Sequence, residues 1–340
     1  MSDVLMLQEA REAAEVVRRQ AKQPLSAVVR AIQAAQPRYV VTVARGSSDH
    51  AATTLKYAIE THLRLPVMSA APSVSGVYGA DLDYQGALVL AVSQSGGSPD
   101  LVEAVERARR NGALTLAMIN QPDSPLHQAA DLTLPLCAGE ERAVAATKSY
   151  LAVLTLGARL LQELNPDPAL ETALARLPDL LDALAAQEEL AEQVAATLVD
   201  AQDLLVLGRG LHQGVAAETA LKLQETAGLA ALAFSTAEFA HGPARLAEPG
   251  VQILALQARD ATAHLTRDTY RTLRGYGAQL TVVGDDADSP AQLPTPASGH
   301  ALTDPALSAL AIQLLIGHLA VLRGENPDAP PRLSKVTRTV

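Results

Sequence analysis

Short apolar segments alternate with longer helical segments along this chain, and that alternation is the strongest constraint on its fold. In the first half, patterns typical of strands fall at residues 39–44, 67–70, 87–92 and 113–119, with a further candidate at 133–136. Helical patterns occupy residues 49–62 and 98–111. The strand segments are almost wholly apolar, as expected when helices cover both faces of a parallel sheet. The first half therefore predicts an α/β fold with a helix-flanked parallel sheet.

The same alternation restarts in the second half. Strand patterns fall at residues 203–207, 229–234, 252–256 and 279–283, and helical patterns at 212–226, 260–276 and 304–323. Between the halves, residues 144–200 have a helical pattern that is interrupted only at residues 165–168. This middle region predicts a helical connection between two lobes. The segment 285–299 is rich in Asp, Pro and Ser, and it predicts a surface loop.

Length and charge limit the classes of partner. The 340 residues are enough for two domains, and a net charge of -10 without a cluster of Lys and Arg argues against a nucleic-acid partner. A single cysteine, Cys137, indicates a reducing compartment. Residues 1–20 lack the apolar core of a signal peptide, and the longest apolar stretch, residues 309–322, is expected to be too short to span a bilayer. We expect a cytoplasmic protein that binds no membrane.

The segment from Ser93 to Ser98 has the features of an anion-binding loop. It joins an apolar strand to a helix start in which Ser98 is the expected N-cap and Pro99 the first helical residue. Gly96 and Gly97 allow a tight turn, and a helix N-terminus presents unpaired amides. The hydroxyls of this segment, together with Gln94, predict a phosphate site at the sheet edge. The alternative is a plain Gly/Ser turn.

A second turn and an internal repeat extend this prediction. The turn Arg45–Ser48 follows the first strand and should place Ser48 at the same sheet edge, while Arg45 either joins the site or pairs with a carboxylate. Val43–Gly46 and Leu207–Gly210 precede similar Ala-rich helices, which predicts an internal duplication rather than chance similarity. At the place of the Ser-rich loop the second half has Gln257–Arg259, so we expect one phosphate site per chain.

Three charged residues share one face of an otherwise apolar helix in the second half. Glu218, Lys222 and Glu225 are spaced i, i+4 and i+7. A helix this apolar is usually buried, so its charges suggest catalysis. The alternative is a solvent-facing stripe of ion pairs, worth about 0.3–0.5 kcal/mol per pair.

Two further residues are candidates for chemistry. His241 follows a strand and precedes Gly242-Pro243, where an imidazole can relay protons near neutral pH, although a single His is more often structural. Lys335 lies in a Pro-rich, extended C-terminal tail that can bring it into a cleft as an amine or as a cation. The alternative for Lys335 is a solvated terminal charge.

Together these motifs resemble the sugar isomerase (SIS) family, in particular the isomerase domain of glucosamine-6-phosphate synthase and stand-alone SIS-type deaminases. The resemblance covers nearly the whole chain and includes Ser93–Gly96, Ala145–Lys148, Glu218–Glu225, Glu238–Pro243 and the tail Leu333–Thr337. It implies two tandem SIS domains, each a doubly wound, flavodoxin-like parallel sheet. The implied divisions are an N-terminal helix 1–27, a first domain 28–165, a helical linker 166–189, a second domain 190–329 and a tail 330–340.

The resemblance also implies roles for individual residues. Glu225 is the base that moves a proton between C1 and C2 of the open-chain sugar, and His241 assists ring opening in the active site of the neighbouring subunit, which implies a homodimer. Lys335 contacts the sugar carbonyl, as a cation or through a Schiff base. The implied phosphate ligands are Ser48, Ser93, Gln94, Ser95 and Ser98, and the supporting residues are Glu218, Lys222 and Glu238. No metal or organic cofactor is required, and no ligand-spaced His/Cys cluster suggests one.

Departures from the synthase narrow the expected function. We expect no glutamine-hydrolysing domain and no N-terminal cysteine nucleophile, and Gln224 and Ala240 stand where the synthase has lysines. These differences favour a glutamine-independent enzyme that converts glucosamine 6-phosphate to fructose 6-phosphate and ammonia. Another aldose–ketose isomerase or a fructosamine-phosphate deglycase is the nearest alternative, and residues 73–83 and 143–148 would discriminate. The role of Lys148 stays open.

A non-catalytic sugar-phosphate regulator is the alternative from another class. Such regulators usually carry a DNA-binding helix-turn-helix, whereas the residues before the first strand predict two amphipathic helices without a basic surface. A regulator also has no use for Glu225, His241 and Lys335 together.

Overall fold

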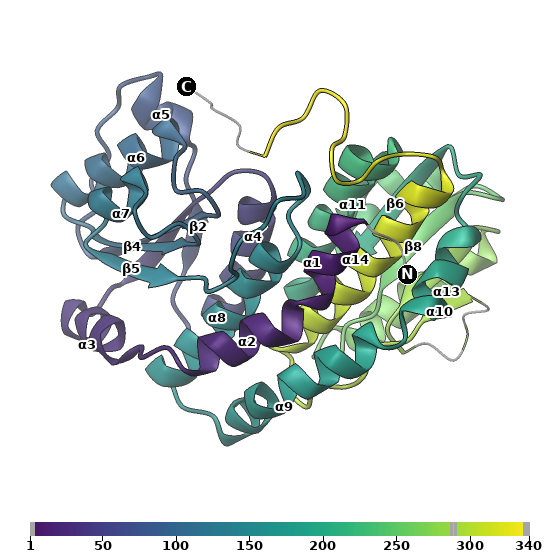
Figure 1. Cartoon of the computed structure of the whole chain (residues 1–340), viewed down its shortest axis with the longest axis horizontal. Coiled ribbons are helices and arrows are strands. Elements are labelled where there is room, and N and C mark those ends of the chain that lie inside the picture. Colours follow the sequence, from purple (N-terminus) through teal and green to yellow (C-terminus); the bar gives the residue numbers. More distant parts are fainter. Residues whose placement is uncertain (1–3, 286–287, 289–290, 336–340) are drawn as a thin grey trace.

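Two parallel sheets of five strands, one in each half of the chain, organise the computed structural model (Figure 1), which describes residues 4–285, 288 and 291–335. The strands are β1 (Tyr39–Val43), β2 (Val67–Ser69), β3 (Ala87–Ser93), β4 (Leu114–Ile119), β5 (Leu132–Pro135), β6 (Asp203–Gly208), β7 (Ala230–Ser235), β8 (Gln252–Leu256), β9 (Gln279–Val283) and β10 (Ala291–Leu293). The helices of the first half are α1 (Leu5–Arg11), α2 (Ala13–Ala21), α3 (Ser26–Ala35), α4 (Ser47–His62), α5 (Pro72–Gly76), α6 (Pro99–Arg110), α7 (Pro125–Ala129) and α8 (Lys148–Leu164). Those that follow are α9 (Pro168–Ala185), α10 (Glu188–Ala196), η1 (Gly210–His212), α11 (Gln213–Ala227), α12 (Thr236–Phe239), η2 (Pro243–Leu246), α13 (Ala263–Gly275) and α14 (Asp304–Leu322).

The two sheets have the same topology. The first has the strand order β2-β1-β3-β4-β5, and the second, read from its other edge, is β7-β6-β8-β9-β10. Each is therefore the 2-1-3-4-5 order of flavodoxin-like folds, with every pair parallel. The shared order confirms the predicted fold class, and it supports the predicted duplication.

Side chains of β3 show why its sequence is continuously apolar. Leu88 and Leu90 belong to the core under α4 and α8, whereas Val89 and Ala91 belong to the core under α6. Successive side chains of a strand point to opposite faces, so a sheet covered on both faces requires apolar residues at every position.

Close packing of α4 on α11 joins the two lobes. Gly214 lies against the backbone of α4, where an added Cβ would approach the carbonyl oxygen of His50 to 2.2 Å. Only glycine allows two helices to come this near. The two lobes are therefore held in fixed relation at the point where α4 and α11 begin.

The apolar stretch near the C-terminus forms α14, which packs against α10 and α11. The prediction that it is too short to span a bilayer was wrong on length, because the helix begins at Asp304 and has 19 residues, enough by length and composition. However, 89% of its most apolar window is buried inside the protein, as in the core helix of a folded domain.

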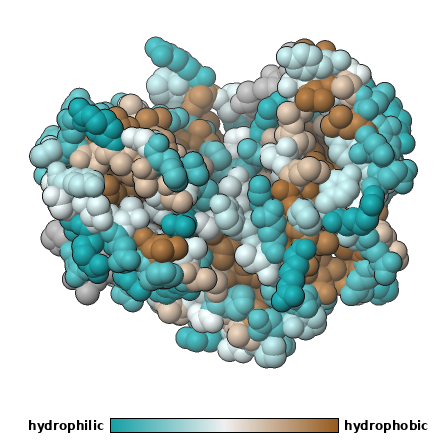
Figure 2. All heavy atoms as spheres, turned by 180° about the vertical axis from the view of Figure 1, so that it is seen from behind, coloured by the Kyte–Doolittle hydropathy of each residue, from teal (hydrophilic) through white to brown (hydrophobic). Residues whose placement is uncertain are grey.

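In Figure 1 the segment after α14 leaves the second lobe and crosses towards the first. Figure 2 shows the opposite face, where apolar patches lie among hydrophilic side chains and a notch separates the lobes.

The predicted loop at residues 285–299 needs a correction. Three of its residues form β10, which pairs with β9 at the sheet edge. A strand of three residues is too short to show a period of two, so its sequence pattern was not visible. Residues 286–287 and 289–290 of the predicted loop lie outside the described residues. The short helices α5 and α7 were also not predicted.

Candidate active site

A cavity of about 330 Å³ lies at the carboxyl edge of the first sheet, between β1 and β3. The strand order reverses direction there, so the helices that follow the two strands diverge and leave a crevice. The described residues that line it are Arg45, Gly46, Ser47, Ser48, Gln94, Ser95, Ser98, Glu141, Val144, Ala146, Lys222, Glu225, Leu333, Ser334 and Lys335. The first lobe, the second lobe and the tail thus all contribute to one cavity.

The Ser-rich loop turns back on itself through its own hydroxyls. The Gly96 amide donates to Ser93 Oγ at 3.0 Å, and the Gly97 amide donates to Ser95 Oγ at 3.3 Å. Ser98 occupies the N-cap position of α6 as predicted, but within the described part of the chain its side chain makes no capping hydrogen bond. That hydroxyl lines the cavity at the start of α6, where it can donate to an anion.

The predicted phosphate residues are placed in two groups. Ser48, Gln94, Ser95 and Ser98 line the cavity. Ser93 is 5% exposed and is not among the described residues that line the cavity, and its hydroxyl shapes the loop by accepting the Gly96 amide. A direct contact of Ser93 with phosphate stays a prediction.

Arg45 borders the cavity while pairing with a carboxylate, which was one of the two alternatives for it. Its Nε donates to Oδ2 of Asp100 at 2.9 Å, and Asp100 Oδ1 accepts the Leu101 amide in the first turn of α6. The Asp100 side chain is almost fully buried, so this pair ties the turn after β1 to the helix after β3.

Replacing Gly96 by Ala is expected to damage the loop. Gly96 has φ +61°, and a Cβ would lie 2.2 Å from Ser124 Oγ and 2.6 Å from its Cβ. Strain and overpacking together should lower the free energy of unfolding by at least about 2 kcal/mol and weaken binding of inorganic phosphate. Denaturant unfolding and calorimetry measure both. Gly97→Ala is the matched control, because its Cβ would come no nearer than 3.8 Å to Ser95 Oγ. Equal behaviour of the two variants would contradict this account.

The charged face of α11 is buried at the lobe junction, so the solvent-facing alternative was wrong. Lys222 Nζ lies 3.6 Å from Glu218 Oε1 and hydrogen-bonds Glu225 Oε2. The side chains of Glu218 and Lys222 are 5% and 2% exposed, whereas Glu225 is 23% exposed and reaches the cavity. Burial alone would lower the pKa of Lys222, but Glu218 and Glu225 more than offset it, and its pKa lies above the ordinary value.

His50 of α4 extends this chain of charges into the first lobe. Its Nδ1 lies 3.0 Å from Glu218 Oε2. Contacts therefore run from His50 through Glu218 and Lys222 to Glu225 at the cavity. Nearby, burial and the charge of Glu218 raise the pKa of Tyr150 well above its ordinary value, so its hydroxyl stays protonated.

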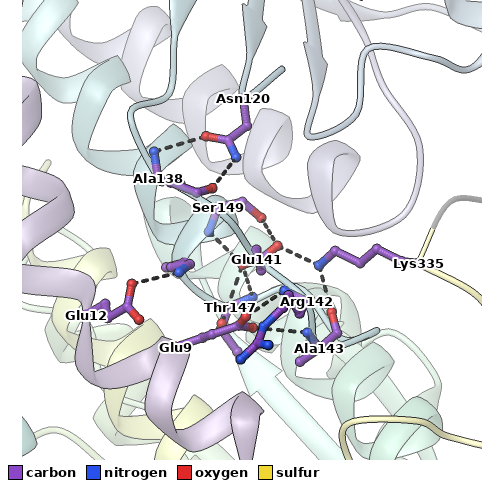
Figure 3. A network of polar contacts seen from close by, with 12 residues as sticks. Glu9, Glu12, Asn120, Ala138, Glu141, Arg142, Ala143, Thr147, Ser149 and Lys335 are labelled. Carbon is purple, nitrogen blue, oxygen red and sulfur yellow. Dashed lines mark hydrogen bonds and ion pairs between the residues drawn. The ribbon is translucent and has the colours of Figure 1, made fainter. Parts of the chain in front are cut away.

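Lys335 lies in the cavity wall as predicted, bound by a carboxylate that the sequence analysis did not select. Figure 3 shows the tail lysine reaching Glu141, with Nζ 2.7 Å from Oε2 and 2.8 Å from the Ala143 carbonyl oxygen. Glu141 also accepts hydrogen bonds from Ser149 Oγ at 2.7 Å and from the Ser149 and Thr147 amides at 3.0 and 3.1 Å. The remainder of the tail motif, Val336 and Thr337, lies outside the described residues.

Lys148, whose role was open, is buried and pairs with Glu12 at 2.7 Å. Glu12 lies between α1 and α2. The neighbouring Glu9 accepts the Arg142 amide at 2.6 Å, so the N-terminal helices are fastened to the loop that carries Glu141. Lys148 thus supports the loop that carries Glu141 from behind. It is not one of the described residues that line the cavity.

The Glu141 pKa predicts an acid-sensitive contribution to stability. Burial alone would raise it, but Lys335 and the hydrogen bonds from Lys335 and Ser149 hold the pKa of Glu141 below its ordinary 4.5. The unfolded chain therefore binds more protons, so this stabilisation is present above pH 4.5 and is lost as the pH falls through the folded value.

We expect Glu141→Gln to lower the free energy of unfolding by about 1–3 kcal/mol at neutral pH, and to flatten its decline below about pH 5. Urea unfolding at several pH values measures both. The exposed neighbour Glu140 supplies the control, Glu140→Gln. If the free energy of unfolding of Glu141→Gln falls with pH as steeply as that of the wild type, Glu141 is not the source of the acid-sensitive stability.

His241 and Glu238 are not brought to the cavity of their own chain. Both are exposed, on α12 and the turn after it, and neither is among the described residues that line the cavity. The segment follows β7, an edge strand of the second sheet. The catalytic role of His241 and the supporting role of Glu238 stay predictions.

Glu141 and His50 are the two functional candidates that sequence reasoning missed. Glu141 stands in a Gly-Glu-Glu run typical of an exposed loop, and His50 stands in the first turn of a helix. The residues around these two positions do not indicate that either side chain pairs with a residue far away in the sequence. Arg45 and the Ala-rich segment near Ala146 were noted, and both border the cavity.

The fold and the cavity define a class of protein: two flavodoxin-like lobes with one polar loop at a switch point and a charged helix facing it. The chain belongs to the SIS domain family, whose model matches residues 35–162 and 197–323. It is homologous to glutamine–fructose-6-phosphate aminotransferases (isomerizing). The protein of Thermococcus kodakarensis is 33% identical over 310 residues, covering 87% of this chain and 51% of the relative. The protein of Symbiobacterium thermophilum is 34% identical over 315 residues, covering 88% of this chain and 51% of the relative. The chain thus spans about half the length of these relatives.

Solved structures agree with this assignment. A protein of Silicibacter pomeroyi, provisionally called a phosphosugar isomerase, has a TM-score of 0.88 and 36% identity, covering 96% of this chain and all of that one. Glucosamine-6-phosphate deaminase of Thermotoga maritima has a TM-score of 0.78 over 98% of this chain and 100% of that chain, but at 22% identity it shows the fold alone.

Proposed function

We propose that this protein is a glutamine-independent glucosamine-6-phosphate deaminase that forms fructose 6-phosphate and ammonia. The observation that carries the proposal is that Glu225, Lys335 and the Ser-rich loop border one cavity. A phosphate held by Ser48, Gln94, Ser95 and Ser98 would orient an open-chain sugar across the cavity towards Glu225. The sequence identity of 33% to an aminotransferase and of 36% to the Silicibacter pomeroyi protein supports a phosphorylated sugar as substrate.

The reaction requires one proton transfer and one hydrolysis. His241 helps to open the sugar ring, and Glu225 then removes the C2 proton and returns it to C1. The C1 aldehyde with a C2 amine becomes a C1 alcohol with a C2 imine. Water adds to the imine carbon and ammonia leaves, which yields fructose 6-phosphate. No oxidant or reductant enters this sequence.

Ammonia release from glucosamine 6-phosphate, without glutamine, tests the proposal when it is coupled to detection of fructose 6-phosphate. Formation of both products in equal amounts is the expected result. Interconversion of aldose and ketose phosphates without ammonia would instead favour an aldose–ketose isomerase, and release of an amine from a phosphorylated fructosamine would favour a deglycase. Stabilisation by sugar phosphates without any turnover would favour a regulator.

A homodimer with shared active sites is part of the proposal. His241 is exposed and stands apart from the cavity of its own chain, which is the placement needed to reach a second copy. The adjoining edge strand β7 exposes 55% of Leu232, and Leu246 nearby is 45% exposed. Exposed apolar side chains on an edge strand favour an interface. We place the enzyme in the cytoplasm, consistent with a single cysteine.

A further inference from the structure

His50 connects the turn that carries Ser48 to the charged face of α11. It stands in the first turn of α4, two residues after Ser48, which lines the cavity. Its Nδ1 lies 3.0 Å from Glu218 Oε2, and the two side chains are 24% and 5% exposed. One turn of one helix therefore carries both a proposed phosphate ligand and a contact with the opposite lobe.

Glu218 extends this contact to the cavity through Lys222. Its second oxygen, Oε1, lies 3.6 Å from Lys222 Nζ and accepts no hydrogen bond from the described residues. Lys222 is 2% exposed and hydrogen-bonds Glu225 Oε2, so two carboxylates share one buried lysine. A positive charge weakens a carboxylate as a base, and sharing that charge with a second carboxylate reduces the effect. The position of Glu218 therefore influences how strongly Lys222 holds Glu225, the proposed base.

Close packing of the two helices keeps this contact in place. A Cβ added to Gly214 of α11 would collide with the carbonyl oxygen of His50 and with Thr54 Oγ1, so α4 and α11 meet backbone against backbone. Helices packed this closely cannot slide past each other without a clash. A displacement of the first turn of α4 is therefore transmitted to α11.

We propose that His50 is a positioning residue for Glu225, which acts through Glu218 and Lys222 and ties the placement of the base to the phosphate turn. This role rests on the proposed function, because the proton that Glu225 moves belongs to the proposed reaction. Phosphate bound by Ser48 orders the same turn of α4 that holds Glu218, so part of its binding energy serves to place the base. His50 is not among the described residues that line the cavity, so it acts on the reaction through its neighbours.

Steady-state kinetics with glucosamine 6-phosphate test this role. Leucine is close to imidazole in size but leaves Glu218 without its partner on α4. We expect His50→Leu to lower kcat about 10–100-fold, while KM and the affinity for inorganic phosphate change less than about threefold. Asparagine offers a nitrogen and an oxygen near the place of Nδ1, so it can pair with Glu218 as donor or as acceptor. His50→Asn should therefore keep at least about a third of kcat.

His62→Leu is the matched control. His62 is the last residue of the same helix, and its Nε2 contacts the backbone oxygen of Asn165, outside the cavity. This variant removes an imidazole from α4 without touching Glu218 and should leave kcat unchanged.

A double-mutant cycle tests whether His50 acts through Glu218. We expect Glu218→Gln to lower kcat by a factor similar to that of His50→Leu, and the double variant to lose less than about threefold more. Losses that multiply would show that the two residues act independently, which would overturn the proposal. If His50→Leu does not fold, Glu218→Gln takes its place with the same expected loss, because it keeps the size of its side chain.

The remaining outcomes separate this role from a structural one. An unchanged kcat in His50→Leu, or equal losses in His50→Leu and His50→Asn, would overturn the proposal and leave the proposed function standing. A loss of phosphate affinity at unchanged kcat would also overturn it, because His50 would then only shape the phosphate turn. If the wild type converts no sugar phosphate, the proposed function fails and the role of His50 fails with it.

Discussion

Glu225→Gln is expected to lower kcat and kcat/KM for glucosamine 6-phosphate together, by about 10²–10⁴-fold. Glutamine keeps the size of the side chain but cannot accept the C2 proton. The phosphate loop belongs to the first lobe, and Glu218 still pairs with Lys222 at 3.6 Å, so neither binding nor folding should change greatly. Steady-state kinetics measure the loss, and calorimetry with inorganic phosphate and glucosamine 6-phosphate checks that the site remains formed.

Glu192→Gln, at an exposed position of α10, is the matched control for this substitution. It removes the same charge outside the cavity and should leave turnover unchanged. Undiminished turnover in Glu225→Gln would remove Glu225 from the reaction and, with it, the proposed proton transfer. A loss of phosphate binding alongside turnover would mean that the substitution disturbs the cavity, not that it removes a base.

Mixing Glu225→Gln chains with His241→Ala chains is expected to restore activity that neither variant has alone. If each site takes Glu225 from one chain and His241 from the other, every mixed dimer has one intact site and one doubly altered site. Random pairing of equal amounts should give about a quarter of wild-type activity in the mixture, and about half in the mixed dimers isolated from it. Co-expression with two different affinity tags isolates the mixed dimers, and their turnover is the measurement.

The structure supplies a matched control for the mixing experiment. Glu225 and Lys335 line the cavity of the same chain. Glu225→Gln mixed with Lys335→Met should therefore restore nothing, because every site then lacks one of the two. Restoration by this second pair, or none by the first, would contradict a site completed by His241 of a neighbouring chain. A protein that elutes as a monomer would contradict the dimer directly.

Local sequence signals predicted the framework of the protein well. Each strand of the first sheet was located within a few residues, because a continuous apolar run between turn residues is visible in the sequence itself. The Ser-rich loop was predicted for the same reason: its strand, its glycines and its Ser98-Pro99 helix start are consecutive in the chain. The alignment of Glu218, Lys222 and Glu225 likewise follows from helical spacing alone.

Tertiary structure alone decided which charges meet. Glu141 binds Lys335 across 194 residues of sequence, and His50 contacts Glu218 across 168. No periodicity links such positions, since the contacts arise only when the tail crosses to the first lobe and α4 packs on α11. The buried state of Lys222 was decided in the same way, because an ion-paired stripe has the same spacing whether a second lobe covers it or water does. The sequence thus determined the elements and the loop that each strand presents, whereas their packing determined the electrostatics of the cavity.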